Sequence, residues 1–311
     1  MIATEAPRTA SAEVVAAHER MLGVSRARSR HLALRSGQCV HILEAGEGPP
    51  VLLLHGSNTS SLSLLPLVEQ LDCVRAIAVD RPGFGLSERD RAPGKRYRDG
   101  AVEFIDEVAR ALELEHFALA GNSMGGTWGL WYALARPERV DGLALLGSAP
   151  LLPGTRVPLP LRVAASPLIG DVLARVPKPT PRMVVRLLTS MGEGETIVRY
   201  PDLIESVAAA GRDPLAAATN LAELRTCITP FGFRRSARLH PDELRRLSVP
   251  TLLIWGDHDP VGHVKVARAI AGLLPEAQLE LLPGGHVPYF GDPQRAAALL
   301  SEFVRPWAAW S

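Results

Sequence analysis

Short, continuous apolar runs recur along the chain, and glycine, proline and polar turn residues bound them. Six of these runs are interpreted as strands: residues 51–54, 75–80, 117–121, 140–147, 251–256 and 277–282. Unbroken apolar runs of this length are typical of strands that are buried on both faces. Four segments with helical spacing of their apolar positions lie between or after these runs: residues 99–112, 124–136, 263–274 and 293–303. The alternation predicts an α/β fold with a mostly parallel central sheet flanked by helices.

Two parts of the chain interrupt this alternation. Residues 1–28 are expected to form an N-terminal appendage that contains a short amphipathic helix over 12–22, and a hairpin with its turn at Ser36 and Gly37 follows. Residues 150–247 carry helical patterns without a clear strand, and such a block is too long for a loop in a compact domain. We therefore expect a core of residues 29–149 and 248–311. The inserted helical lid, residues 150–247, would follow a strand end, where open α/β sheets bind ligands.

The segment Gly121-Asn122-Ser123-Met124-Gly125 is a G-x-S-x-G pentapeptide between an apolar run and a helical pattern. A sharp strand-to-helix turn of this kind exposes the serine hydroxyl. The flanking glycines leave room for the turn, and the N-terminus of the following helix favours negative charge. This context favours Ser123 as a nucleophile over a chance occurrence of the pentapeptide.

Several separate motifs occur in one order along the chain: LLLHG (52–56), DRPGFGLSE (80–88), GNSMGG (121–126), LLIWGDHDP (252–260) and PGGHVP (283–288). With these motifs the chain resembles the α/β-hydrolase superfamily, in the lidded branch that contains serine esterases and meta-cleavage C–C hydrolases. The resemblance covers residues 30–304 apart from the variable lid. It implies an α/β-hydrolase fold and a hydrolytic activity that requires no cofactor.

A serine hydroxyl needs an adjacent base, and histidine suits that task because its pKa lies near 6.5. His286 follows the last apolar run in a Gly-Gly turn, where this family has its base. The family pattern places the orienting acid at Asp259, while Asp257 would shape the turn and Asp141 is a remote third choice. The order Ser123, Asp259, His286 is the order of the catalytic triad in this fold.

Two backbone N–H groups are expected to stabilise the negative charge that acyl transfer builds on a carbonyl oxygen. The amide of Met124 directly follows the nucleophile, and the amide of Ser57 lies in the loop after LLLHG. Asn58 and Asn122 are candidate substrate-binding residues, with a turn residue as an equal alternative for Asn58. His55 is interpreted as a structural residue of the same loop.

Three functions are open, and hydrolysis of a small, hydrophobic carboxylic ester through an acyl-enzyme ranks first. Asn122 within GNSMGG resembles the meta-cleavage C–C hydrolases. However, Val287 stands where that branch usually has tryptophan, and only Arg186 and Arg199 are candidates for its lid arginine. Ser123 excludes the aspartate-nucleophile chemistry of haloalkane dehalogenases and epoxide hydrolases. A hydrolase-like protein that binds a ligand without turnover is the third possibility.

Apolar residues of the expected lid either line a substrate pocket or pack the lid on itself: Met183, Leu187, Met191, Phe231 and Phe233. A pocket built from them would suit a lipophilic acyl or aryl group.

The composition and the sequence motifs restrict the expected binding partners and the expected cellular location of the protein. Lysine and arginine number 34 and aspartate and glutamate 33, so the overall charge indicates no nucleic-acid partner. Three separated cysteines without a CxxC pair indicate neither a disulfide scaffold nor a zinc site. His258 and His263 lie near Asp259 without metal-ligand spacing, so no metal is expected. A membrane span and a signal peptide are not expected either, which predicts a cytoplasmic protein with a small-molecule substrate and leaves a homo-oligomer open.

Overall fold

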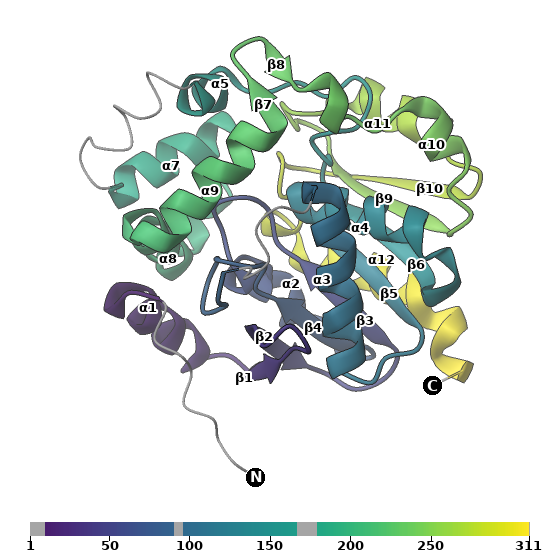
Figure 1. Ribbon diagram of the computed structural model, residues 1–311, viewed down its shortest axis with the longest axis horizontal. Coiled ribbons are helices and arrows are strands. Elements are labelled where there is room, and N and C mark those ends of the chain that lie inside the picture. The colour runs from purple at the N-terminus through teal and green to yellow at the C-terminus, as the bar shows by residue number, and fades with distance from the viewer. Residues whose placement is uncertain (1–9, 90–95, 167–178, 311) are drawn as a thin grey trace.

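A sheet of eight strands runs through the middle of the molecule (Figure 1). The computed structural model describes residues 10–89, 96–166 and 179–310. In spatial order the strands are β1 (Arg28–Ala33), β2 (Cys39–Ala45), β4 (Arg75–Val79), β3 (Pro50–Leu54), β5 (Phe117–Asn122), β6 (Val140–Leu146), β9 (Thr251–Gly256) and β10 (Ala277–Leu282). The pairs β1–β2 and β2–β4 are antiparallel, and the other neighbours are parallel. The predicted mostly parallel sheet is therefore confirmed.

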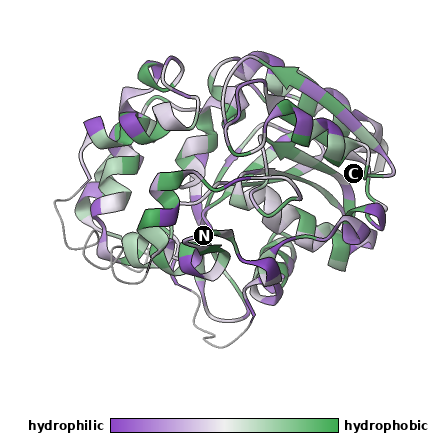
Figure 2. Ribbon diagram, turned by 90° about the horizontal axis from the view of Figure 1, so that it is seen from above, coloured by the Kyte–Doolittle hydropathy of each residue, from purple (hydrophilic) through white to green (hydrophobic). Residues whose placement is uncertain are grey.

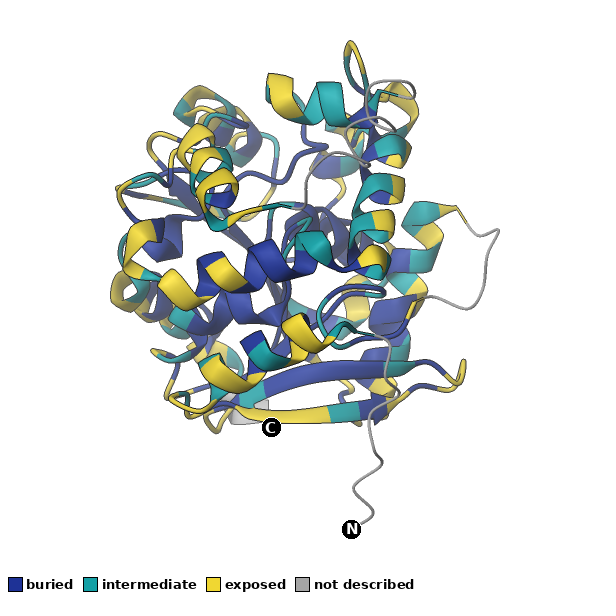
Figure 3. Cartoon of the chain, turned by 90° about the vertical axis from the view of Figure 1, so that its left-hand side faces the viewer, coloured by how far each residue is buried: buried dark blue, intermediate teal, exposed yellow. Residues whose placement is uncertain are grey.

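Helices cover both faces of this sheet. On β3, Leu52 and Leu54 pack into one core cluster while Val51 and Leu53 pack into the other. The first cluster includes residues of α3 (Tyr97–Ala111), α4 (Met124–Ala135) and α11 (Val264–Ala271), and the second includes residues of α2 (Leu65–Val68) and α12 (Pro293–Val304). Burial on both faces explains why the strands appear in the sequence as unbroken apolar runs. The central strands are dark blue in Figure 3, whereas the surrounding helices carry exposed positions as well.

The N-terminal hairpin differs slightly from the expectation. Its first strand begins at Arg28, within the expected appendage of residues 1–28, because Arg28 pairs with Glu44 at the far end of the hairpin. The turn is where the sequence predicts it, with Gly37 at a φ of 80°. A glycine accommodates this conformation at little cost, since it has no Cβ.

Most helices between β6 and β9 lie together at one side of the sheet, whereas the last of them, α10, lies apart from the others (Figure 1). We refer to residues 150–247 as the helical segment. Its elements are α5 (Leu159–Ala165), α7 (Pro181–Ser190), α8 (Pro201–Arg212), α9 (Pro214–Cys227), the hairpin of β7 (Ile228–Thr229) and β8 (Gly232–Phe233), and α10 (Pro241–Arg245). Four of these helices begin with proline, which has the right φ for a first helical position and lacks an N–H that would otherwise be unpaired there. The two-residue strands were not expected, because they are too short to produce a pattern.

The N-terminal helix α1 (Ala12–Leu22) has the predicted bounds and packs against α8. Figure 1 shows the two helices side by side. The backbone N–H of Ser11 donates to Asp213 Oδ2 at 2.7 Å, and Arg212 Nε donates to Glu13 Oε2 at 2.6 Å. Further along α1, His18 is buried against the core. The helix therefore bridges the helical segment and the sheet.

The helices generally present both hydrophobic and hydrophilic residues, as Figure 2 shows by hydropathy. Within the described parts of the chain, none of them is long and apolar enough to cross a membrane.

Candidate active site

Ser123 occupies the turn between β5 and α4 with a φ of 53° and a ψ of −119°. A positive φ is rare for a residue with a side chain and persists only where the surroundings enforce it. A Cβ atom at Gly121 would lie 2.4 Å from the carbonyl carbon of Gly125, and one at Gly125 would lie 2.1 Å from the Leu54 carbonyl oxygen. The two glycines of the pentapeptide therefore allow strand, turn and helix to pack this closely, as the sequence predicts.

His286 and Asp259 lie in contact at the carboxyl ends of β10 and β9. The Nδ1 atom of His286 lies 3.1 Å from Oδ2 and 3.2 Å from Oδ1 of the carboxylate. Burial alone would lower the pKa of His286, but the charge and the hydrogen bond of Asp259 outweigh it and raise this pKa. Burial would likewise raise the pKa of Asp259, but the charge of His286 and hydrogen bonds from His286 and Ser148 lower it to about 2. The pair therefore consists of an ionised carboxylate and an imidazole that holds a proton more tightly than usual.

Ser148, two residues after the end of β6, belongs to this arrangement and was not identified from the sequence. Its backbone N–H donates to Asp259 Oδ2 at 3.0 Å, and its Oγ lies 3.2 Å from His286 Nδ1. The backbone N–H of Val261 donates to Asp259 Oδ1 at 2.9 Å, so both carboxylate oxygens are held. Ser148 follows a predicted strand, and the carboxyl ends of parallel strands lie at one edge of the sheet. Its position in the sequence could therefore have indicated that it lies near the site.

The other carboxylates weighed in the sequence lie elsewhere. Asp257 Oδ1 accepts the backbone N–H of Gly284 at 3.0 Å, which is the turn-shaping role expected for it. Asp141 is half-buried at the start of β6, 3.6 Å from the exposed His116.

The helical segment holds the loop that carries the histidine. The backbone N–H of His286 donates to the Met191 carbonyl oxygen at 2.9 Å, and that of Val287 donates to Glu193 Oε1 at 2.7 Å. Glu193 is fully buried, and Thr196 donates to its second carboxylate oxygen. Nothing in the sequence indicates that this glutamate, among many others, faces inward.

Ser123 and His286 line the same cavity, whose volume is about 390 Å³. The structure shows no hydrogen bond between the Ser123 hydroxyl and the imidazole, so proton transfer requires the two groups to approach further. Hydrogen bonds of this kind are often loose in enzymes without substrate and tighten when substrate binds.

Apolar side chains of the helical segment form much of the cavity wall: Pro158, Pro160, Leu161, Ala164, Leu187, Leu188, Met191, Val207, Leu224, Ile228 and Phe233. Leu187, Met191 and Phe233 were among the candidates for such a wall. Met183 and Phe231 are instead exposed, by 48% and 92%. None of the described lining residues is arginine or lysine, and Arg186 and Arg199 are not among them.

The predicted oxyanion-hole residues Ser57 and Met124 line this cavity, as does Asn58, which has a φ of 55°. The ring of His55 is engaged within the protein. Its Nε2 accepts the backbone N–H of Arg81 at 2.9 Å, and its Nδ1 lies 2.7 Å from the Gly56 carbonyl oxygen. This agrees with the structural role expected for His55.

Arg81 and Glu223 form a buried ion pair behind the same loop. The guanidinium donates to Glu223 Oε2 at 2.5 Å, to the His55 carbonyl at 3.0 Å and to the Gly56 carbonyl at 2.9 Å. Glu223 lies on α9, and the hydroxyl groups of Ser57 and Tyr97 also donate to its carboxylate. Burial alone would raise the pKa of Glu223, but the charge of Arg81 and these hydrogen bonds lower it. An ionised carboxylate of the helical segment thus contacts the loop that carries Ser57.

A second cavity, of about 510 Å³, is lined by both Arg81 and Glu223, and it shares Glu223 with the first cavity. Ser123 is not among its lining residues, so we place the candidate active site in the smaller cavity.

Asn122 also lines the smaller cavity, but its amide nitrogen is engaged within the protein. It donates to the Leu146 carbonyl at 2.6 Å and to the His286 carbonyl at 3.0 Å. These contacts fix the backbone of the histidine loop relative to β6.

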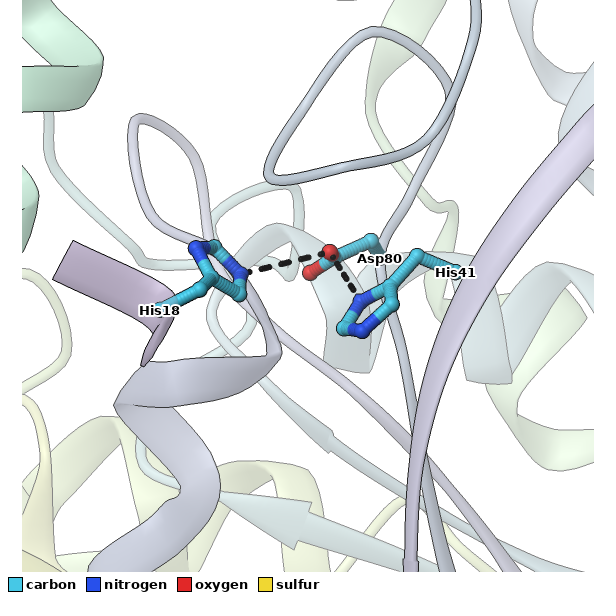
Figure 4. Close-up of side chains that lie close together, drawn as sticks. All are labelled: His18, His41 and Asp80. Carbon is cyan, nitrogen blue, oxygen red and sulfur yellow. Dashed lines mark hydrogen bonds and ion pairs between the residues drawn. The ribbon is translucent and has the colours of Figure 1, made fainter. Parts of the chain in front are cut away.

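Another histidine–aspartate cluster lies outside this cavity, between α1 and the sheet (Figure 4). His41 Nδ1 lies 2.7 Å from Asp80 Oδ2, His18 Nε2 lies 3.8 Å from the same oxygen, and Ser29 Oγ lies 2.8 Å from His41 Nε2. Ser29 contacts His41 and His41 contacts Asp80, so these three side chains resemble a Ser–His–Asp triad in their contacts. However, Ser29 is exposed on the edge strand β1 and lines none of the described cavities. Within the described residues, His18, His41 and Asp80 are the group that could hold a metal ion.

Comparison with known proteins gives a consistent result. A family model described as the α/β-hydrolase fold matches residues 49–173, which include the turn at Ser123. Haloalkane dehalogenase 2 of Mycobacterium tuberculosis is 29% identical over 271 residues, covering 85% of this chain and 90% of that protein. The 2-hydroxymuconate semialdehyde hydrolase of Pseudomonas putida is 29% identical over 292 residues, covering 87% and 92%.

Among solved structures, carboxylesterase CesB from Bacillus subtilis superposes with a TM-score of 0.73 at 23% identity, covering 94% of this chain and 96% of that one. This similarity establishes the fold. The family match, the relatives of nearly full length and the eight-stranded sheet together show the α/β-hydrolase fold and support membership of the α/β-hydrolase superfamily.

Proposed function

We propose that the protein is a serine hydrolase that cleaves small, hydrophobic carboxylic esters through an acyl-enzyme. The observation that carries the proposal is the His286–Asp259 pair, which borders the cavity that Ser123 also lines. The mostly apolar wall and the lack of arginine or lysine among its described residues favour an uncharged, lipophilic substrate.

In the proposed mechanism, Nε2 of His286 takes the proton of Ser123 while the serine oxygen attacks the ester carbonyl carbon. Asp259 holds the imidazole in the correct tautomer and stabilises its protonated form. The backbone N–H groups of Ser57 and Met124 stabilise the oxyanion. The imidazolium then protonates the departing alcohol, and a water molecule hydrolyses the acyl-enzyme with His286 again as the base.

We also propose that residues 150–247 act as a lid on a core of residues 29–149 and 248–311, with residues 1–28 as an appendage. The lid would supply the apolar wall and hold the two loops that carry His286 and Ser57. This proposal is supported by the hydrogen bonds from those loops to Met191, Glu193 and Glu223. We assign Asn122 to the positioning of His286 rather than to substrate binding.

The test is hydrolysis of p-nitrophenyl esters by Ser123→Ala, with Ser29→Ala as the matched control. Ser123→Ala should lose several orders of magnitude in rate while its fold is retained, since residual catalysis then comes from binding and the oxyanion hole alone. Ser29→Ala should react at the wild-type rate, although Ser29 also faces a histidine–aspartate pair. A fluorophosphonate adduct on the Ser29 peptide, or unchanged turnover by Ser123→Ala, would overturn the assignment.

Carbon–carbon bond hydrolysis is the second candidate, and the relative named as a 2-hydroxymuconate semialdehyde hydrolase favours it. A substrate of that kind carries a carboxylate, for which the described cavity wall offers no arginine or lysine. The protein should therefore hydrolyse esters but not ring-cleavage diketones, so the visible absorbance of a diketone should stay unchanged when the protein is added. Rapid loss of the diketone colour would reverse this ranking. Dehalogenation is not proposed despite the dehalogenase relative, because a serine stands at position 123.

A further inference from the structure

A buried cluster of two imidazoles and one carboxylate joins α1 to the sheet, away from the candidate active site (Figure 4). His18 is 2% exposed, and His41 and Asp80 are fully buried. One ligand atom from each residue lies within 4.8 Å of the other two. We propose that this cluster binds a divalent transition-metal ion of the zinc type, which fastens α1 to the core.

The unpartnered nitrogen of His18 is the first support. Its Nδ1 lies 3.1 Å from the Val14 carbonyl oxygen, and a carbonyl oxygen only accepts hydrogen bonds, so Nδ1 carries the proton. In a neutral ring, Nε2 then presents a lone pair, and this atom is buried without a hydrogen-bond partner. It faces Asp80 Oδ2 at 3.8 Å, which is too long for a hydrogen bond. A lone pair directed at a carboxylate is unfavourable unless a cation lies between the two.

The surroundings of the ligand atoms are those of a metal site. In such sites the second ring nitrogen of each histidine is engaged by an outer group. Here Nε2 of His41 lies 2.8 Å from Ser29 Oγ, and Nδ1 of His18 is bound to a backbone carbonyl. The carboxylate of Asp80 is oriented by the backbone N–H of Ser61 at 2.6 Å and that of Leu86 at 2.9 Å.

Two of the three ligand-atom separations lie within about half an ångström of those in tetrahedral coordination. Zinc–nitrogen and zinc–oxygen bonds of about 2.0–2.2 Å place neighbouring ligand atoms about 3.3 Å apart. The two measured separations from Asp80 Oδ2, 2.7 Å to His41 Nδ1 and 3.8 Å to His18 Nε2, lie on either side of this value. His41 must present a free lone pair at Nδ1, and it can do so as a neutral ring by moving its proton to Nε2, which then donates to Ser29 Oγ. Binding to two neutral rings therefore needs no other proton acceptor.

The proposed site has a structural consequence and no part in the proposed hydrolysis. Because α1 also contacts α8 and Asp213, a bound ion would link the N-terminal helix, the sheet and the helical segment. Metal sites of this kind couple binding to folding, so the ion should raise the thermal stability of the chain.

The experiment uses the full chain, purified without a polyhistidine tag, stripped with a chelator and kept reduced. One equivalent of Zn²⁺ should bind, as measured by elemental analysis after gel filtration, and should raise the melting temperature. His18→Gln should weaken binding at least about 100-fold, since even loss of an outer-sphere partner costs 10–100-fold in metal affinity. The matched control is His258→Gln, which alters an exposed histidine that pairs with Asp257 and should leave Zn²⁺ binding unchanged.

Ester hydrolysis should be equal in wild type and His18→Gln, so this test stands apart from the proposed function. Failure of the stripped wild-type chain to retain Zn²⁺ or Co²⁺ would overturn the proposal, and so would equal binding by His18→Gln. A melting temperature that responds to pH between 5 and 8 but not to metal would show that a proton, rather than a metal ion, occupies the gap between His18 and Asp80. The wild-type measurements decide the matter even if the variant fails to fold.

Discussion

Replacement of Glu223 by glutamine removes the carboxylate that contacts the guanidinium of Arg81. The side chains are 4% and 1% exposed, so water cannot take the place of the lost charge. Breaking a buried ion pair by neutralising one partner typically costs about 3–5 kcal/mol, because the other charge remains buried. Ser57 and Tyr97 donate to different oxygens of the carboxylate, and glutamine keeps only one acceptor oxygen, so one of these hydrogen bonds is lost as well. We therefore expect a loss within this range, about 3–5 kcal/mol.

Urea unfolding followed by tryptophan fluorescence measures this loss. The matched control is Glu243→Gln, which neutralises the Arg98–Glu243 pair, whose side chains are 40% and 20% exposed. Exposed pairs contribute at most about 1 kcal/mol, so the control should unfold almost like the wild type. The double variant Arg81→Met with Glu223→Leu should be more stable than Glu223→Gln, since no unpaired charge remains buried. It should stay less stable than the wild type, because the carbonyl groups of His55 and Gly56 lose the hydrogen bonds that Arg81 donates.

Equal losses for Glu223→Gln and Glu243→Gln would refute the reasoning. A double variant less stable than Glu223→Gln would also refute it, because the penalty would then not come from an unpaired charge. The same ion pair fixes the carbonyl groups of His55 and Gly56, so Glu223→Gln should also lower kcat more than it raises KM.

Three further predictions concern the site and its turn. Ser148→Ala should lower kcat/KM about threefold to tenfold in steady-state ester hydrolysis, since it removes one neutral hydrogen-bonding partner of His286 worth about 0.5–1.5 kcal/mol; an unchanged value would show that only the Ser148 backbone matters. The raised pKa of His286 predicts that the acidic limb of the kcat/KM profile lies above pH 6.5, and Asp259→Asn should move it to lower pH and reduce kcat roughly 10⁴-fold. The two residues contribute to the free energy of unfolding in opposite pH ranges. The contribution of His286 is complete below pH 6.5 and is lost as the pH rises through its raised pKa, whereas that of Asp259 is present above about pH 3.9 and is lost as the pH falls through about 2. Unfolding curves recorded across this pH range test both. Gly121→Ala should destabilise the fold by about 1–3 kcal/mol or more, because its Cβ would clash with the Gly125 backbone. Gly100→Ala on α3 has open space around it and should stabilise the fold by about 0.5–1 kcal/mol. Similar shifts of the melting temperature in the two variants would contradict this reasoning.

Much of the fold could be predicted from local pattern. Five of the six predicted runs became interior strands because both faces of the sheet are covered, whereas residues 277–282 became the partly exposed edge strand β10. The helix over residues 12–22 has the expected bounds. The turn at Ser123 could be predicted because glycines at 121 and 125 are a local requirement of that geometry. The hairpin of β7 and β8 could not, since two residues per strand carry no periodicity.

The candidate site was only partly accessible from the sequence. The assignments of Ser123, Asp259 and His286 follow from motifs, and they remain predictions until the variants are measured. The partners that hold these residues come from distant parts of the chain: Glu223 lies 142 positions from Arg81, and Glu193 lies 94 positions from Val287. Pairing at such separations depends on how the helical segment packs on the sheet, and one sequence does not encode it in a local pattern.

The contacts of Met191, Glu193 and Glu223 with the loops that carry His286 and Ser57 limit how this protein can be engineered. A chimera in which another hydrolase's residues replace the helical segment would lose Glu223, and the buried guanidinium of Arg81 would then lack a counter-charge. Such a chimera should therefore fold only if the incoming residues supply an acid at that point, or if Arg81 is exchanged together with them. Changes of substrate range in this scaffold are better sought at cavity-facing positions such as Leu187 and Phe233, which leave that connection intact.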